Sequence, residues 1–313
     1  MKFSAARETL LKPLQAVIGV VERRQTMPIL SNVLLMARDG HLSVTATDLE
    51  VELVAETDVD TETGGEITVS GRKLLDICRA LPEGTTVNVS LCGEKLAVMG
   101  GRSKFNLATL PAAEFPVIDD IKAGQSIGVS QETLGKLIEK THFSMAQQDV
   151  RYYLNGMLLE TGGAYLRAVA TDGHRLALCQ AELSAKLDQQ QVIVPRKGVL
   201  ELQRLMTGDG DLEIELGANH VRIQLDGIRF TSKLIDGRFP EYERVIPKES
   251  SNELKADRGA FRGALQRTAI LSNEKYRGIR LVIRDSGVVL QAHNPEQEEA
   301  EEELEVEYAG EDI

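Results

Sequence analysis

Short runs in which apolar and polar residues alternate recur along the chain, and each has the period of a strand with one buried face. Thr86–Leu91 and Leu212–Leu216 show this alternation most clearly. Because successive side chains of a strand point to opposite faces, such runs predict sheets with one face in a core and the other in water. In the first third of the chain we expect strands at 2–4, 32–38, 41–47, 49–55, 67–69, 86–91, 95–99 and 103–109.

Apolar residues spaced three and four positions apart predict helices as well. In the second of these helices, Arg72 and Arg79 are seven positions apart and therefore share the face opposite the apolar side. Pro13 lies inside the first helix, which we expect to kink or restart there because proline lacks a backbone N–H. Cys78 falls on an apolar side and is expected to be a buried structural thiol. The five predicted helices span 7–24, 72–81, 131–143, 196–207 and 257–272.

The sequence repeats itself at a spacing of 124 residues. The segment Leu42–Asp48 (LSVTATD) returns as Leu166–Asp172 (LRAVATD). A fixed period over separated matches indicates tandem copies of one domain. Two further pairs keep the same spacing: Glu8–Lys12 with Glu132–Lys136, and Phe115-Pro116 with Phe239-Pro240.

A third copy begins but is shorter than the other two. Ala260–Leu265 corresponds to the start of the first helix of each copy, and Val289–Asn294 corresponds to the Ala-Thr-Asp strand. The printed sequence then ends about 50 residues short of the repeat length, so we expect an incomplete third domain.

Each full copy contains two half-copies with the order β-α-β-β-β. Five such units are present in the sequence, and six are expected from the repeat. This order predicts an α+β fold in which helices pack on one side of antiparallel sheets. The predicted domains are 1–124, 125–249 and 250–313, with breaks near Ala123–Gln125 and Glu249–Ser251.

The decapeptide Glu296–Glu305 contains seven glutamates. Such a run is usually solvated and often disordered. Here it also falls where the repeat requires a strand, so a paired edge strand with a basic partner is the alternative.

The net charge of −12 argues at first against a nucleic-acid partner. The predicted helices, however, hold 15 Lys and Arg against 7 Asp and Glu, whereas the remainder of the chain holds 21 against 41. Ordinary solvated helix faces would explain this excess. The alternative is a basic surface built from helices inside an otherwise acidic body.

Motifs for catalysis or for a cofactor are missing from the sequence. It contains neither a nucleophile elbow nor a phosphate-binding loop, and its five histidines lack metal-ligand spacing. Three cysteines without a close pair fit a reducing cytosol. The N-terminus lacks a signal-peptide pattern, and no apolar run reaches membrane-spanning length. We therefore expect a cytoplasmic protein without metal or cofactor.

The segment Thr171–Arg175 (TDGHR) allows three interpretations. Asp172 and His174 could belong to a hydrolytic centre, although nothing supplies a nucleophile or an oxyanion hole. The segment could equally be a turn whose polar groups bond to one another. The third interpretation is a surface pocket for a partner, which the apolar neighbours Leu154 and Leu176 favour.

Longer motifs resemble the bacterial DNA polymerase III β subunit, the replicative sliding clamp, and the resemblance runs across all 313 residues. It implies a DNA-clamp fold, a homodimeric ring of six similar domains with helices lining a central hole and sheets outside. The motifs are Arg151–Gly156 (RYYLNG), Ala170–Leu176 (ATDGHRL), Val194–Gly198 (VPRKG), Asp236–Pro240 (DGRFP) and Ile270–Lys275 (ILSNEK).

The resemblance also implies three sets of functional residues. One set contains Tyr152 and Tyr153, for which packing in the core is an alternative to contact with DNA. Duplex DNA would be contacted by Arg24, Gln148, Tyr152, Tyr153, Arg196 and Lys197. Short peptide motifs would bind a groove formed by Leu154, Thr171, Gly173, His174, Arg175, Leu176, Pro240 and Val245. The ring interface would join Ile270, Leu271, Glu296, Glu298, Glu299, Glu301 and Glu302 to Lys73, Lys95, Arg102 and Lys104 of a second copy.

The sequence therefore predicts a processivity factor without enzymatic activity. It would hold duplex and primed DNA without sequence preference and tether the replicative polymerase, the clamp loader and other proteins that carry a clamp motif. A hydrolase centred on Asp172 and His174 is the alternative from another class. A nearer alternative is a truncated clamp that binds peptides but cannot close a ring.

Overall fold

The computed structural model describes residues 1–22, 27–118, 124–206, 208–248, 252–284 and 286–313. The chain forms two compact units, Met1–Phe239 and Pro240–Ile313. The larger unit contains the first two sequence repeats, β1 to β9 and β10 to β15. The predicted breaks near residues 124 and 250 lie beside or within undescribed residues and stay predictions.

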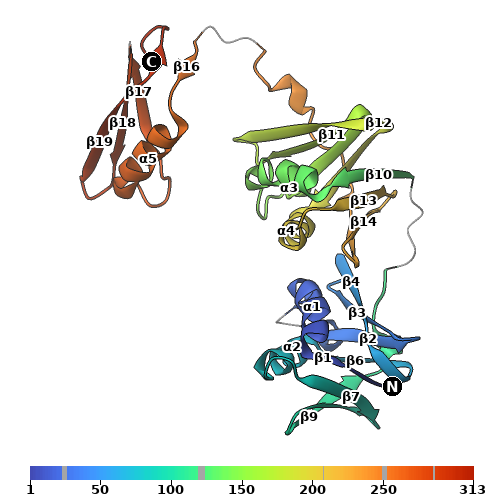
Figure 1. The fold of residues 1–313 in the computed structure, drawn as a ribbon. Coiled ribbons are helices and arrows are strands. Elements are labelled where there is room, and N and C mark those ends of the chain that lie inside the picture. Colours follow the sequence, from blue (N-terminus) through green and yellow to red (C-terminus); the bar gives the residue numbers. More distant parts are fainter. Residues whose placement is uncertain (23–26, 119–123, 207, 249–251, 285) are drawn as a thin grey trace. The chain divides into compact units, whose positions relative to one another are not determined.

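The first repeat follows the predicted order of two β-α-β-β-β units (Figure 1). Its strands are antiparallel, and the predicted strands are all present. One strand, β5, was not predicted and pairs with β1. The strands are β1 (Lys2–Ala6), β2 (Asn32–Arg38), β3 (His41–Thr47), β4 (Val51–Asp58), β5 (Asp60–Thr63), β6 (Gly65–Ser70), β7 (Thr86–Cys92), β8 (Lys95–Gly100) and β9 (Ser103–Leu110).

The second repeat has the same two units, but its neighbouring strands run together into longer ones. Fourteen residue pairs join β11 to β12 as a long antiparallel ribbon. Its strands are β10 (Gln125–Ser130), β11 (Gly156–Thr171), β12 (Leu176–Pro195), β13 (Asp211–Leu216), β14 (His220–Leu225) and β15 (Ile228–Lys233).

One sheet crosses from the second repeat into the first. Its thirteen strands have the order β10-β13-β14-β15-β4-β3-β2-β6-β9-β8-β7-β1-β5. The crossing is the pairing of β15 with β4, which runs from Ile228 opposite Ala55 to Ser232 opposite Val51. The two repeats are therefore joined by backbone hydrogen bonds as well as by side chains.

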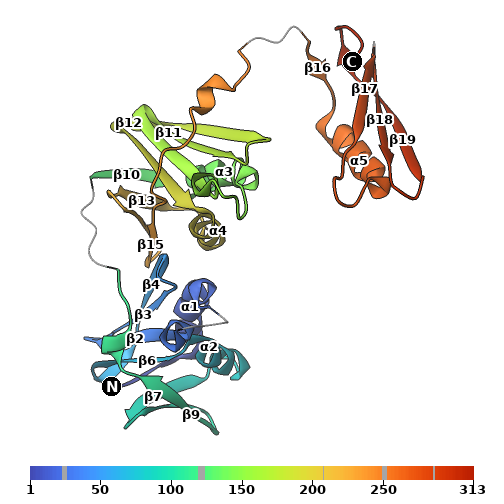
Figure 2. The ribbon, with the colours of Figure 1, turned by 180° about the vertical axis from the view of Figure 1, so that it is seen from behind.

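The helices lie on one side of their sheets, as predicted from the pattern (Figure 1, Figure 2). Helix α1 (Arg7–Val17) contacts α2 (Gly71–Ala80), and α3 (Gln131–Glu139) contacts α4 (Arg196–Leu205). Their apolar sides meet the inward faces of the strands in a shared core of Leu, Val, Ile and Ala. Cys78 is fully buried in this core, and burial raises the pKa of its thiol to about 11, as expected of a structural cysteine.

Three predicted helices end earlier than expected and continue as short 3₁₀ segments. These segments are Ile18–Val20 after α1, His142–Ser144 after α3 and Ala269–Leu271 after α5. Of the two effects predicted at Pro13, a kink or a restart, the restart was wrong, because α1 runs through this buried proline; the kink stays a prediction. Tight 3₁₀ turns are frequent at helix ends, and the apolar spacing alone does not reveal them.

The smaller unit contains one β-α-β-β-β unit. Its elements are β16 (Leu254–Lys255), α5 (Arg258–Thr268), β17 (Arg280–Arg284), β18 (Gly287–His293), β19 (Glu299–Glu305) and β20 (Glu307–Tyr308). Ala264 of α5 packs on Val288 and Leu290 in a small core. Together with the four units of the larger part, five units are found among the described residues, and the predicted α+β clamp fold is confirmed.

The glutamate run forms a strand rather than a disordered segment. Strand β19 pairs with β18 along seven residues and lies at an edge of its three-stranded sheet. Its residues alternate between exposed and half-buried, so Glu299, Glu301, Glu303 and Glu305 share the exposed face. A strand pattern with charged residues at an edge also hinders unspecific strand pairing.

We predict that Phe230→Ala lowers the free energy of unfolding of the larger unit by about 3–5 kcal/mol, the usual loss for a buried aromatic residue. Phe230 is fully buried on β15, the strand that joins the two repeats. Urea denaturation followed by circular dichroism measures the change. Phe143→Ala is the control, because the Phe143 side chain is 50% exposed; an equal loss in both variants would contradict the prediction.

Candidate functional site

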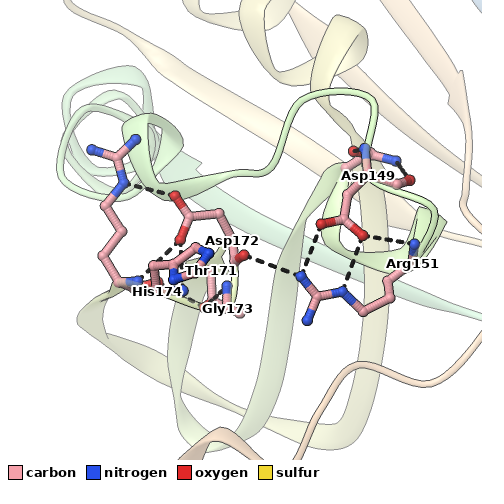
Figure 3. Close-up of polar contacts among 8 residues, drawn as sticks. Asp149, Arg151, Thr171, Asp172, Gly173 and His174 are labelled. Atoms are coloured by element: carbon pink, nitrogen blue, oxygen red, sulfur yellow. Dashed lines mark hydrogen bonds and ion pairs between the residues drawn. The ribbon is translucent and has the colours of Figure 1, made fainter. Parts of the chain in front are cut away.

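The segment Thr171–Arg175 is a tight turn whose polar groups bond to one another (Figure 3). The Thr171 hydroxyl donates to the Arg175 carbonyl at 2.7 Å and accepts the Gly173 N–H at 3.1 Å. One carboxylate oxygen of Asp172 accepts the N–H groups of His174 and Arg175 at 2.9 and 3.0 Å. The other oxygen pairs with the Arg175 guanidinium at 3.0 Å. This geometry is the local turn, one of the three interpretations of the sequence.

A second segment, Gln148–Tyr153, is tied to this turn by Arg151. The guanidinium of Arg151 binds the Asp149 carboxylate through two hydrogen bonds, of 2.8 and 3.0 Å, and also donates to the Asp172 carbonyl at 3.3 Å. Asp149 is held in turn by Asn155, which accepts its N–H and donates to its carbonyl. Figure 3 shows Arg151 between the Asp149 carboxylate and the turn.

These contacts shift the pKa of both acids. The Arg151 side chain, together with its backbone N–H, lowers the pKa of Asp149 from 3.8 to about 2. For Asp172, partial burial opposes ionisation, but the N–H groups of Arg175 and His174 and the Arg175 side chain outweigh it and lower the pKa. Both carboxylates are therefore ionised at neutral pH and act as hydrogen-bond acceptors.

The first repeat builds the same turn at Thr47–Val51. Its four hydrogen bonds join equivalent atoms at 2.7–3.1 Å. The residue that takes a left-handed conformation is Leu49, with φ 78°, where the second repeat has Gly173, with φ 87°. The two turns differ in the partner of the remaining Asp oxygen, because Asp172 pairs with Arg175 and Asp48 pairs with Lys197.

A cavity of about 340 Å³ opens beside the turn of the second repeat. It joins two predicted groove residues, His174 and Arg175, to one predicted DNA contact, Arg196. The guanidinium of Arg175 lies over the Phe143 ring, 5.8 Å from its centroid. The remaining lining residues are Met145, Ala146, Gln147, Asp149 and Asp172.

The other predicted groove residues differ in exposure. Leu176 is half-buried, whereas Leu154 is only 2% exposed and offers almost no surface to a ligand. Pro240 and Val245 belong to the smaller unit, where Val245 is 70% exposed. The grouping of Pro240 and Val245 with the turn stays a prediction.

Among the described DNA contacts that were predicted, two are exposed and three are half-buried. Gln148 has an exposed side chain and φ 57°, and Tyr152 is 57% exposed, so core packing does not explain this tyrosine. Tyr153 is half-buried, and its ring meets the Tyr152 ring edge-on, with centroids 5.8 Å apart. Arg24 lies outside the described residues. The two remaining contacts, Arg196 and Lys197, are half-buried at the start of α4.

The predicted interface residues also divide between the two units. In the larger unit, Lys73, Lys95, Arg102 and Lys104 are all exposed. In the smaller unit, Ile270 is 76% exposed, and a cavity of about 440 Å³ is lined by Ile270, Leu271, Glu296 and Glu298 among others. Glu302 differs from the other glutamates because Arg267 of its own chain binds its carboxylate and lowers its pKa.

Three residues near the turn were not predicted, namely Phe143, Asp149 and Arg151. Arg151 and Asp149 are two positions apart, as in many surface pairs, and only the fold brings Arg151 to the Asp172 carbonyl. Phe143 follows α3 in a segment predicted to be helical. An Asp-x-Arg pair shortly before a strand that leads to a Thr-Asp turn is the signal that could have identified Asp149 and Arg151.

The structure also bears on catalysis and on membranes. Both oxygens of Asp172 are occupied by hydrogen bonds within the turn, so this carboxylate is poorly placed to act as a base. Among the described residues, no group of three or more His, Cys, Asp and Glu could hold a metal ion. Within the same residues, no helix is long and apolar enough to cross a membrane.

Three family models match the chain in sequence order. They are those of the N-terminal, central and C-terminal domains of the DNA polymerase III β subunit, at residues 1–119, 128–241 and 243–313. Together these matches cover nearly the whole chain.

Individual relatives give the same result. The chain is 55% identical to the β sliding clamp of Pseudomonas aeruginosa over 313 aligned positions, and the alignment covers 99% of this chain and 85% of that protein. It is 53% identical to the β sliding clamp of Escherichia coli K12, with the same coverage. A crystal structure of the P. aeruginosa sliding clamp bound to griselimycin superposes with a TM-score of 0.96 at 54% identity, covering 100% of this chain and 86% of that one.

We predict that Arg151→Ala raises the pKa of Asp149 from about 2 towards its ordinary value of 3.8, because the Arg151 side chain is the largest cause of the lowered pKa, whereas the backbone N–H of residue 151 is kept in the variant. The folded-state pKa is depressed, so the contribution of this contact to stability is present above about pH 4 and is lost as the pH falls towards 2. Carboxyl carbon NMR titration measures the shift. An unchanged pKa in Arg151→Ala would contradict the assignment.

We further predict that Gly173→Ala disturbs the link between the two segments. A Cβ at this position would lie 3.0 Å from the Arg151 guanidinium. The alanine would also have to adopt φ 87°, which costs about 1–2 kcal/mol for a residue with a side chain. The pKa of Asp149 should then rise, and NMR titration measures it. Gly163→Ala is a matched control, because Gly163 has φ 59° and nothing within 4 Å of its Cβ position; its variant should leave Asp149 unchanged.

Proposed function

This chain belongs to the family of DNA polymerase III β subunits, the bacterial sliding clamps, and we propose that it encircles duplex DNA as a homodimeric ring. The observation that carries the proposal is a pair of open strand edges of opposite charge, one in each compact unit. Joined head to tail, two copies would bring each basic edge to an acidic one and close a cyclic assembly.

The basic edge belongs to β9. Residues 103–108 of β9 pair with β8, and only Thr109 and Leu110 pair with β6. Along 103–108 the other side of β9 therefore has no strand partner among the described residues. Arg102 and Lys104 lie at this edge, and Lys95 lies opposite Ala108 on the neighbouring strand.

The acidic edge belongs to β19, which pairs with β18 alone. Glu299 and Glu301 project from its exposed face, and Gln291 donates to Glu301 without removing its charge. Exposed ion pairs contribute only about 0–1 kcal/mol each. We infer that the charges orient the two copies, and that Ile270 and Leu271 together with backbone pairing supply most of the affinity.

Helices α1 to α5 would line the hole. Their excess of Lys and Arg favours phosphate contacts, which are independent of sequence and weaken with salt. Enclosure would retain the DNA while these weak contacts permit sliding. Gln148 and Tyr152 are exposed and could reach the DNA, in agreement with the predicted set.

Partner proteins would dock at the turn Thr171–Arg175 and its adjoining cavity. We propose that an extended peptide with a glutamine and two apolar residues binds there, carried by the replicative polymerase, the clamp loader or another partner. A clamp of P. aeruginosa has been solved with griselimycin bound, so a relative of this chain does take up a ligand. The protein would work without catalysis or cofactor in the cytoplasm, where the bacterial chromosome is replicated.

Topological retention on DNA tests the ring. A clamp loader from a relative would load the protein onto nicked circular plasmid, and gel filtration at high salt would then remove protein held by charge alone. Protein should stay with the circle and leave once the plasmid is cut to a linear form. Release at the same rate before and after cutting would refute encirclement.

We predict that Ile270→Ala combined with Leu271→Ala weakens the dimer at least tenfold, which corresponds to about 1.4 kcal/mol. Ile270 is 76% exposed in the isolated chain and would be buried by the second copy. Glu299→Gln combined with Glu301→Gln should weaken the dimer less and reduce its dependence on salt. Sedimentation over a concentration series measures both effects.

Leu200→Ala serves as the control for these variants, because Leu200 is an exposed leucine of α4 outside the proposed interface. It should leave the dimer intact. A dimer that survives the loss of both Ile270 and Leu271 unchanged would refute this interface.

A further inference from the structure

Helix α4 of the second repeat carries two basic side chains that reach into the first repeat. The ammonium of Lys197 forms an ion pair with Asp48 and lies 3.7 Å from the Glu22 carboxylate. The guanidinium of Arg204 donates to the carbonyls of Gln15 and Ala16 at 3.2 and 2.5 Å. Both contacts lie within the larger unit, and both join segments more than 140 residues apart in the sequence.

The second oxygen of the Asp48 carboxylate has Lys197 as its charged partner. Its first oxygen accepts the N–H groups of Glu50 and Val51, and the residue is only 8% exposed. In the equivalent turn of the second repeat, Arg175 supplies the cation from within the turn. The first repeat has Val51 at that position, so the cation must come from elsewhere, because a buried carboxylate without a partner is strongly unfavourable.

The position of Lys197 in its own helix supports the same role. It is the second residue of α4, where the positive end of the helix dipole disfavours a lysine. Desolvation also acts against its charge, yet Asp48, Glu22 and Glu50 outweigh it and raise the pKa of Lys197. The charged form of Lys197 is therefore stabilised at this helix start by acidic residues of the first repeat.

Arg204 acts at the end of α1. The last four carbonyls of a helix lack partners within the helix, and those of Gln15 and Ala16 are among them. Arg204 satisfies both, and Glu201 holds its guanidinium in place at 2.9 Å. The approach is close, because a Cβ on Gly19 would lie 2.0 Å from the Glu201 carboxylate.

We propose that Lys197 and Arg204 are positioning residues that lock α4 of the second repeat onto α1 and the Thr47–Val51 turn of the first. They thereby fix the angle between the first and second repeats at the β4–β15 junction. Lys197 thus has a role distinct from the DNA contact that the resemblance implies. Only the consequence for ring closure, which needs a constant angle between domains, rests on the proposed function.

Hydrogen exchange of the free protein, followed by mass spectrometry, tests the lock without DNA or a ring. In Lys197→Met, which keeps most of the length of the side chain but removes its charge, the amides of β4 and β15 should exchange at least fivefold faster. Lys197→Arg should restore most of the protection. Lys136→Met is the control, because Lys136 is an exposed lysine of α3, and its variant should exchange like the parent.

A double-mutant cycle separates the ion pair from general damage to the fold. Asp48→Asn keeps an oxygen for the N–H groups of Glu50 and Val51 but removes the charge that holds Lys197. If the lock operates, combining Asp48→Asn with Lys197→Met should accelerate exchange no more than the stronger single change. Additive effects would refute coupling between the two residues.

A Lys197 that only contacts DNA predicts a different outcome for the exchange experiment. If Lys197 only contacts DNA, Lys197→Met should lower the affinity for primed DNA and leave exchange of β4 and β15 at the parental rate, which would overturn the proposal. Arg204→Met should accelerate exchange in the same strands as Lys197→Met. If the protein is not retained on circular plasmid but Lys197→Met still accelerates exchange, only encirclement is refuted. The two proposals can therefore fail independently.

Discussion

The antiparallel pairing of β15 with β4 is the constraint on which the larger unit depends. Five residue pairs turn two repeats into one continuous sheet, and residues 51–55 and 230–232 are buried at this seam. Glu52 lies in the seam opposite Thr231, where burial raises the pKa of its carboxyl although the Ile118 N–H, at 2.9 Å, stabilises the charge. The segment around Ile118, which follows the last strand of the first repeat, is thus hydrogen-bonded to the seam between the two repeats.

Strand pairing across a repeat boundary also explains why the two Thr-Asp turns have different surroundings. The turn Thr47–Val51 directly precedes β4, so the second repeat packs against it, and the Glu50 carbonyl accepts the Lys233 N–H at 2.8 Å. The turn Thr171–Arg175 directly precedes β12, whose strand partner is β11 alone among the described residues. One turn is therefore part of an internal junction, whereas the other borders an open cavity.

Most of the fold could be predicted from the sequence because its signals are local or periodic. Alternation at Thr86–Leu91 identified β7, and the 124-residue spacing alone identified the tandem repeats. The exceptions were the 3₁₀ ends of the helices and the passage of α1 through Pro13, where packing overrides the local preference. The merging of strands into the β11–β12 ribbon depends on tertiary pairing and leaves no periodic signal.

The candidate site was predictable in outline, since the TDGHR motif stands out from the repeat. The contacts that organise it were not, because Arg151 reaches Asp172 across 21 positions and Lys197 reaches Asp48 across 149. Charge counts had assigned Lys197 to a basic helix surface without revealing that its neighbours are acidic. A single sequence gives the charge of a residue, but its partner is determined only by the fold.

The left-handed residue of the two turns has a consequence for how the copies can diverge. Leu49 takes φ 78° in a turn that Lys197 and the Lys233 N–H contact from the second repeat. The equivalent turn has Gly173 at this position and is contacted from outside by Arg151. A residue other than glycine is strained at this backbone conformation, so contacts from its surroundings decide whether it is tolerated. The mutational freedom of each turn is thus set by what packs around it, so equivalent positions of the two repeats need not accept the same substitutions.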